Sequence, residues 1–163
     1  MVAVVVQALE LSPGASVLEV GAGSGYLAAV LRAAGAGRVV GLELVPELAA
    51  QARRNVNQAG ITGVVISVGD GRQGAPRRAP FDAVVVSAAA TTIPPALLSQ
   101  VANHGKLICP VASGGSERLW CLQREDGVWS RRDLGECRFV PLLGDDDLGG
   151  GEQTDEVGAA PIL

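Results

Sequence analysis

A glycine-rich segment between an apolar strand and a helix is the feature that most constrains the fold of this chain. Residues 16–20 predict a strand, and residues 26–34 predict a helix that Gly35 terminates. Between them, residues 21–25 read Gly-Ala-Gly-Ser-Gly. Glycine permits a sharp turn and a close approach of the backbone to a ligand, and the helix N-terminus presents unpaired N–H groups. The segment predicts either a tight strand-to-helix turn or, as we favour, the same turn with a ligand beside it.

Strands and helices continue to alternate after this unit. The expected strands are continuous apolar runs, which are typical of a sheet covered by helices on both faces. Their alternation with helices implies parallel pairing through right-handed crossovers. The sequence therefore predicts an α/β fold with a doubly wound, Rossmann-like sheet. Further strands are expected at residues 38–44, 63–68, 81–87 and 105–111, and helices at 1–11, from Pro46 to a stop at Gly60, and from Pro94 to Val101.

The pattern changes after residue 111. Residues 117–123 and 127–132 read as two strands around the turn Arg-Glu-Asp-Gly, with no helix between them. We expect them to form an antiparallel edge on a mostly parallel sheet. Residues 145–163 are acidic and glycine-rich, and we expect them to form a disordered tail. The predicted organisation is one domain over residues 1–144 followed by this tail.

Composition excludes several classes of function. The formal net charge is −4, so the chain offers no basic field for nucleic acid. No apolar run approaches the length of a membrane span, and the apolar N-terminus lacks the basic region of a signal peptide. The three cysteines have no metal or redox spacing. We therefore expect a cytoplasmic protein without a metal, and without nucleic acid or membrane as partners.

The spacing of the glycines discriminates between two ligands. A dinucleotide-binding loop carries glycine at its first, third and sixth positions, but here the sixth position is Tyr26. The pattern is G-x-G-x-G, preceded by Glu19 two residues before the first glycine. This pattern resembles motif I of class I S-adenosylmethionine-dependent methyltransferases. Dinucleotide binding remains the alternative.

Two acidic positions follow the next strands at the same predicted edge. Glu43 lies near the end of the second strand, where a carboxylate can accept hydrogen bonds from both ribose hydroxyls. Asp70 and Gly71 follow the third strand, where the carboxylate can accept from the exocyclic amine of adenine. The plainer interpretations are a solvated acid at Glu43 and an ordinary Asp-Gly turn.

The order of the motifs along the chain resembles the protein-L-isoaspartate O-methyltransferase family. The chain reads VLEVGAGSGY, GLELVPELA, VGDG, APFDAVVVSAAA, IPPALLSQ, GKLICPV and DLGECRFVPLLG, in that order. The segments PFDAVVVSAAA and RFVPLLG are far more specific to this family than motif I. The resemblance implies an S-adenosylmethionine site at Gly21, Ala22, Gly23, Gly25, Glu43, Asp70 and Gly71, and a site for the isoaspartyl residue at Ala88, Ala89, Ala90 and Val140.

The family reaction is methyl transfer to the free carboxylate of an isoaspartyl residue, a first step in the repair of damaged proteins. Because that carboxylate is already ionised at neutral pH, it needs no general base. We expect a monomer whose partner is a protein or peptide carrying isoaspartate. An inactive S-adenosylmethionine-binding module and an NAD-dependent oxidoreductase are the alternatives.

The chain departs from the family at its N-terminus. Family members carry a segment ahead of motif I that ends in a stretch like T-I-S-A-P-H-M-V-A, whereas this sequence begins at Met1-Val2-Ala3. The part of that stretch that bears hydroxyl groups is therefore absent from the sequence. We expect cofactor binding with weak or absent isoaspartyl methylation.

Overall fold

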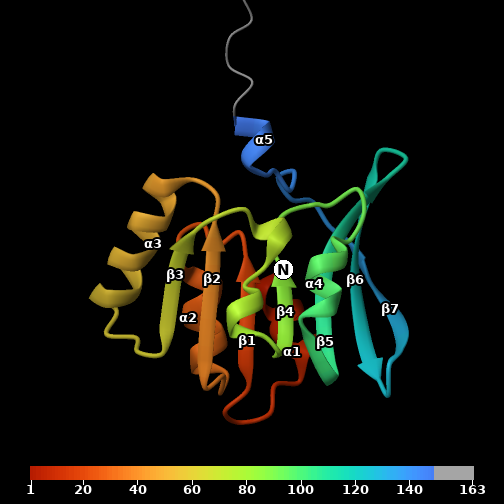
Figure 1. Ribbon diagram of the computed structural model, residues 1–163, viewed down its shortest axis with the longest axis horizontal. Coiled ribbons are helices and arrows are strands. Elements are labelled where there is room, and N and C mark those ends of the chain that lie inside the picture. Colours follow the sequence, from red (N-terminus) through yellow and green to blue (C-terminus); the bar gives the residue numbers. More distant parts are fainter. Residues whose placement is uncertain (149–163) are drawn as a thin grey trace, which may run out of the picture.

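A central sheet with helices on both faces forms the protein, as a computed structural model describes it for residues 1–148 (Figure 1). The strand order is β3-β2-β1-β4-β5-β6-β7. The strands are β1 Ser16–Val20, β2 Arg38–Glu43, β3 Val64–Val68, β4 Phe81–Val86, β5 Val101–Ser113, β6 Ser116–Glu125 and β7 Val128–Glu136. The helices are α1 Val2–Leu9, α2 Tyr26–Ala33, α3 Pro46–Gln58, α4 Pro95–Ser99 and α5 Asp145–Leu148, with 3-10 turns η1 Gly71–Gln73 and η2 Pro76–Arg78.

The pairing of the strands confirms the predicted fold class. β1 lies between β2 and β4 and pairs with both in parallel, and β3 and β5 extend the parallel part on either side. β6 and β7 add an antiparallel ribbon at the β5 edge. Because the chain leaves β1 toward β2 and β3 and later returns to β4, the strand order reverses beside β1, and such a switch point opens a crevice at the carboxyl ends of the strands.

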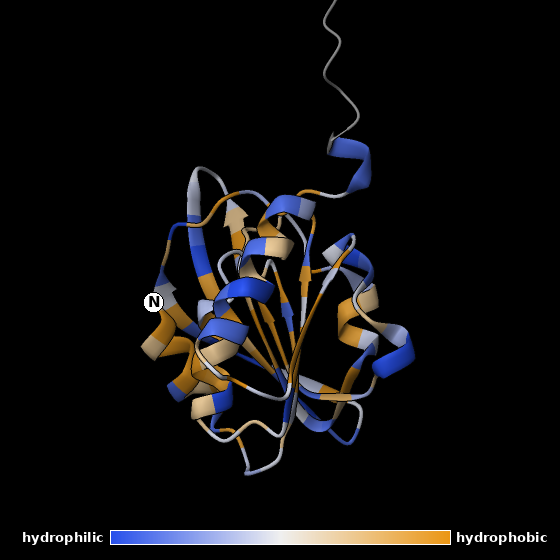
Figure 2. Ribbon diagram, turned by 90° about the vertical axis from the view of Figure 1, so that its left-hand side faces the viewer, coloured by the Kyte–Doolittle hydropathy of each residue, from blue (hydrophilic) through white to orange (hydrophobic). Residues whose placement is uncertain are grey.

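Two apolar cores lie on opposite faces of this sheet. Residues of α1, α2 and α3 pack on one face, where the buried side chains include Leu9, Leu31 and Ala52. The other face is covered by α4 and the connection before β4, with Leu97 and Phe81 fully buried. Figure 2 shows the apolar strands between helices on either side. Covering both faces explains why the strands read as continuous apolar runs.

The structure differs from the expected elements at several places, and β7 in particular runs to Glu136 rather than to residue 132. Helix α4 ends at Ser99 rather than at Val101, and β5 begins at Val101, where it pairs with Phe81 across an irregular register. Residues 145–148 form the short helix α5, so the expectation of disorder from residue 145 is wrong for these four residues. The remainder of the expected tail, 149–163, lies outside the described residues.

Three predictions from composition can be compared with the described part of the chain. Cys109 and Cys121 are buried in the core, and all three cysteines have free thiols. None of the helices between residues 1 and 148 is long and apolar enough to span a membrane. Within the same residues, no group of His, Cys, Asp and Glu side chains is arranged to hold a metal ion.

Candidate functional site

A cavity of about 310 Å³ lies at the carboxyl ends of β1, β2 and β4, at the predicted crevice. In Figure 1 these are the upper ends of the strands, below the blue helix α5. The lining combines the glycine loop, the β2–α3 turn, the end of β4 and a segment near the C-terminus. These lining residues are Val20, Gly21, Gly23, Leu42, Glu43, Leu44, Val45, Leu48, Gly71, Ser87, Ala88, Val140, Pro141, Leu142 and Leu143.

The glycine loop is held against β2, which leaves one side of it free. The backbone N–H groups of Gly21 and Ala22 both donate to the carbonyl of Leu42, over 2.8 and 3.0 Å. A Cβ atom on Gly23 would have no heavy atom within 4 Å, whereas one on Gly25 would lie 3.0 Å from the Val56 side chain. Gly25 therefore serves the packing of α2 on α3, and Gly23 presents bare backbone toward the cavity.

Glu43 connects the glycine loop to the start of α3. Its Oε2 accepts from the N–H of Gly23 over 2.8 Å, and its Oε1 accepts from the N–H of Val45 over 3.1 Å. The residue is 7% exposed. An ionised carboxylate has about four acceptor positions. Two of these therefore remain for ligand hydroxyls at the cavity wall, so the plain interpretation of Glu43 as a solvated acid is wrong.

Asp70 is close to the site, but its carboxylate is engaged by Arg72. The Arg72 guanidinium donates to both carboxylate oxygens, with Nε–Oδ1 and Nη2–Oδ2 distances of 3.1 and 2.8 Å. This contact holds the pKa of Asp70 below its usual range. The Asp70 side chain also accepts from the Arg72 backbone N–H, which begins η1. Gly71 lies against β1, where an added Cβ would collide with Val20.

The four residues predicted for the substrate divide into two groups. Ala88 and Val140 line the cavity. Ala89 and Ala90 are not among its lining residues, and their backbones join the end of β4 to other segments. Ala89 N–H donates to the carbonyl of Val140 over 2.7 Å, and Ala90 N–H donates to the carbonyl of Pro110 over 2.9 Å.

Residues 140–144, which we call the strap, close one side of the cavity. The bond from Ala89 and a second from the N–H of Leu142 to the carbonyl of Ala89, 2.8 Å, hold the strap on the segment that follows β4. Beyond it, Arg72 pairs with Asp146 and with Asp147, the latter with an Nη1–Oδ2 distance of 3.5 Å. Arg72 therefore joins the loop after β3 to the segment after the strap.

Sequence reasoning missed most of the apolar lining. Leu44 and Ser87 end expected strands, and Val45 and Leu48 follow one, so their place at the carboxyl edge was a usable signal. Leu142 and Leu143 belong to the segment RFVPLLG, but the pairing of the strap with the segment that follows β4 is a long-range contact that no local pattern encodes.

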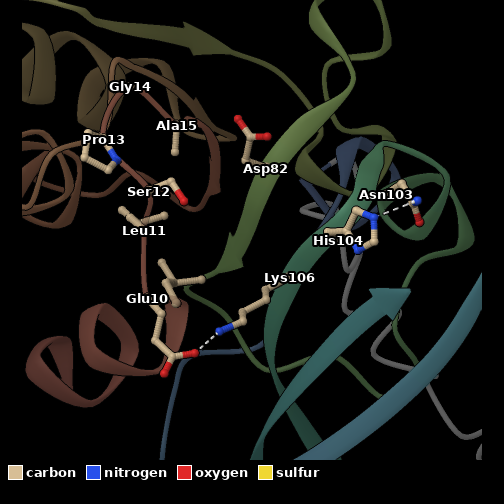
Figure 3. A pocket seen from close by; sticks show the side chains of 11 residues that line it. Glu10, Leu11, Ser12, Pro13, Gly14, Ala15, Asp82, Asn103, His104 and Lys106 are labelled. Atoms are coloured by element: carbon tan, nitrogen blue, oxygen red, sulfur yellow. Dashed lines mark hydrogen bonds and ion pairs between the residues drawn. The ribbon is translucent and has the colours of Figure 1, made fainter. Parts of the chain in front are cut away.

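A second depression lies at the opposite end of the sheet, beside the start of β4 (Figure 3). Its charged side chains are already paired: Lys106 contacts Glu10, and Asp82 accepts from Ser16, while Asn103 contacts His104. His104 lies within β5 with a φ of 64°, beside the irregular register between β4 and β5. These contacts leave the cavity at the carboxyl ends of the strands as the better candidate site.

Comparisons with known proteins agree on one family. The family described as Protein-L-isoaspartate(D-aspartate) O-methyltransferase (PCMT) matches residues 1–147. The protein-L-isoaspartate O-methyltransferase of Methanopyrus kandleri is 44% identical over 150 residues, covering 90% of this chain and 66% of that protein. The protein of the same name from Pyrococcus horikoshii is 42% identical over 150 residues, covering 89% of this chain and 67% of the relative. The chain thus spans about two thirds of the length of these relatives.

Solved structures give the same result. A protein-L-isoaspartate O-methyltransferase superposes with a TM-score of 0.80 at 27% identity, over 88% of this chain and 46% of the other. A Plasmodium falciparum protein of that description, solved in complex with S-adenosyl-L-homocysteine, gives a TM-score of 0.73 at 27% identity. That match covers 85% of this chain and 69% of the Plasmodium protein.

Proposed function

Since the chain belongs to the protein-L-isoaspartate(D-aspartate) O-methyltransferase family, we propose that it binds S-adenosylmethionine in the cavity beside the glycine loop. We further propose that its reaction is transfer of the methyl group to the free carboxylate of isoaspartyl residues in damaged proteins. The single observation that carries this proposal is the bond between Glu43 and the Gly23 N–H at the cavity wall.

The residues of the cavity fit this cofactor. Gly23 leaves the backbone open to a ligand, and Glu43 keeps acceptor positions for the two ribose hydroxyls. Leu44, Val45 and Leu48 supply apolar surface of the kind that covers an aromatic base. Asp70 remains our proposal for the adenine amine, with Gly71 beside it, and Arg72 is then a competitor for the same oxygens.

The reaction requires little of the protein beyond positioning the substrate and the cofactor. When bound, the cofactor supplies an electrophilic methyl group on a sulfonium. The protein has to hold the substrate carboxylate in line with that group and exclude water, and such positioning can provide about 7–11 kcal/mol of the barrier. Ala88 and Val140 at the cavity wall suit this role, because apolar side chains place no competing nucleophile beside the substrate.

The rim of the cavity suits a peptide chain as substrate. Val140 is 70% exposed, and Leu48 and Leu143 are 47% and 43% exposed. Exposed apolar side chains gathered around one opening are typical of an interaction surface. They support a protein or peptide carrying isoaspartate as the partner. The free cysteines of the described residues support a reducing, cytoplasmic compartment.

Ligand binding and methyl transfer test the proposal separately. Thermal unfolding with S-adenosylmethionine, S-adenosylhomocysteine or NAD comes first, since a ligand at a hundred times its dissociation constant stabilises by about 2.7 kcal/mol. We expect stabilisation by the first two ligands and none by NAD, whereas stabilisation by NAD alone would favour an oxidoreductase. Transfer of labelled methyl to an isoaspartyl peptide, with the aspartyl peptide as control, then separates an enzyme from an inactive binding module.

A further inference from the structure

Glu19 is a buried acid that the proposed chemistry does not use. It lies on the central strand β1, beside Gly41 of β2 and Val85 of β4, and is 1% exposed. Because side chains alternate along a strand, Glu19 points to the same side as Val17, into the core under α1, α2 and α3. Its Oε2 atom has no hydrogen-bond partner among the described residues. A buried polar atom without a partner is costly and calls for an explanation.

The surroundings of Glu19 connect it to the cofactor cavity. Its carboxyl group interacts with the backbone N–H of Ala28, in the first turn of α2, where Gly25 provides no side-chain cap. It also lies within electrostatic reach of Glu43, whose carboxylate holds the Gly23 N–H. Glu19 is thus buried two residues before the glycine loop, and Glu43 holds that loop from its side.

Burial, and next the negative charge of Glu43, raise the pKa of Glu19 to about 8. The Ala28 N–H opposes this shift without cancelling it. Other charged groups on the packed elements are engaged elsewhere or exposed. On the neighbouring strands, Arg38 of β2 donates to Arg78 and Asp82 of β4 accepts from Ser16. On the helices, Arg32 of α2 donates to Thr62, Arg53 of α3 to Ile66 and Arg54 of α3 to Gln51. Glu47 of α3 is exposed, and α1 carries no charged side chain.

We propose that Glu19 is protonated in the ligand-free protein and gives up this proton to the solvent when a cationic ligand occupies the cavity. The inference rests on the proposed function, because S-adenosylmethionine carries a sulfonium and an ammonium against one carboxylate. Its net charge of about +1 at neutral pH would stabilise an ionised Glu19, since charges interact strongly through a poorly polarisable interior. S-adenosylhomocysteine lacks the sulfonium, so it should displace less of the proton.

This linkage makes Glu19 a positioning residue that distinguishes cofactor from product. While the sulfonium is present, the ionised carboxylate favours the bound cofactor and accepts more strongly from the Ala28 N–H. After methyl transfer the positive charge is gone, and Glu19 takes a proton back from the solvent. The loss of this attraction lowers the affinity for the product relative to the cofactor, so the residue favours exchange of one for the other.

Nuclear magnetic resonance of the ligand-free protein tests whether Glu19 is protonated there. With glutamate labelled at the side-chain carboxyl carbon, the signal of Glu19 is the one that Glu19→Gln removes. We expect it to titrate near pH 8, and Glu47→Gln, at an exposed acid of α3, should leave this signal in place. A Glu19 midpoint below pH 6 would overturn the inference without affecting the proposed function.

Calorimetry at pH 7 tests whether this proton is released on ligand binding. Because the ionisation enthalpies of phosphate and Tris differ, the binding enthalpies in the two buffers give the number of protons released. A group with a pKa of about 8 is roughly 90% protonated at this pH, so up to about 0.9 proton per S-adenosylmethionine is expected in the buffer. Glu19→Gln should abolish this release, and Glu47→Gln should leave it unchanged. Binding without release, or equal release by Glu19→Gln, overturns the inference alone, whereas absence of binding overturns the proposed function as well.

Discussion

Replacing Glu43 by alanine tests whether this carboxylate holds both the glycine loop and the ligand. In the free protein the change removes the acceptor of two backbone N–H groups, those of Gly23 and Val45. Gly23 is half-buried at the cavity wall, so water can replace part of the lost acceptor. A fully buried donor that loses its partner costs about 1–3 kcal/mol, and we therefore expect a decrease near the lower end of this range in the free energy of unfolding.

The same substitution should weaken ligand binding further. Hydrogen bonds from ribose hydroxyls to a charged acceptor contribute about 1.5–3 kcal/mol, which corresponds to a loss of roughly 10- to 150-fold in affinity for S-adenosylhomocysteine. Urea denaturation measures the stability, and calorimetry measures the affinity. Glu47→Ala, at an exposed acid in the first turn of α3, is the control: it should leave the affinity unchanged and lower the stability by at most about 0.3–1 kcal/mol, through the helix dipole. Equal affinity of wild type and Glu43→Ala would refute the assignment of Glu43 to the ribose.

Three further outcomes are expected. Gly23→Val should abolish binding of S-adenosylhomocysteine, as measured by calorimetry. The control is Gly14→Val, at a glycine that also has open space and a positive φ, which should cause similar strain and leave binding intact. Arg72→Gln should destabilise the protein at neutral pH, because it removes the ion pair with Asp70. Since this ion pair requires the ionised carboxylate, the difference in stability from wild type should vanish as the pH falls through the lowered pKa of Asp70, as measured by urea unfolding at a series of pH values. Leu97→Ala, which truncates a fully buried side chain of α4, should lower the free energy of unfolding in urea by about 2–5 kcal/mol. A smaller effect would mean that α4 contributes little to the core on its face of the sheet.

The parallel sheet and the glycine loop were predictable because their signals are local. β1 has the bounds that the sequence indicates, since an apolar run ends at a glycine that only a turn accommodates. The junction at Val101 was not predictable in the same way. Its apolar side chain suits a helix face as well as a strand, and only the pairing with Phe81 across the sheet decides for the strand.

Part of the candidate site depends on contacts that sequence spacing does not encode. Gly23 was predicted because it follows the first strand, and Glu43 because it lies near the end of the second strand, at the same edge. The structure brings the two residues into contact. The ion pairs of Arg72 with Asp70 and Asp146 were missed, because they require the turn η1 and a segment more than seventy residues away. The role of Asp70 toward adenine stays a prediction.

The strap also bears on how the protein acquires its site during synthesis. Chains fold from the N-terminus as they leave the ribosome, so the residues up to β5 are available to pair before the strap has been made. The wall formed by residues 140–143 can close the cavity only after the antiparallel ribbon of β6 and β7 has been synthesised. A nascent chain thus builds its glycine loop early and completes the compartment around it late. Truncation within the strap would leave the nucleus of the sheet and remove the enclosure.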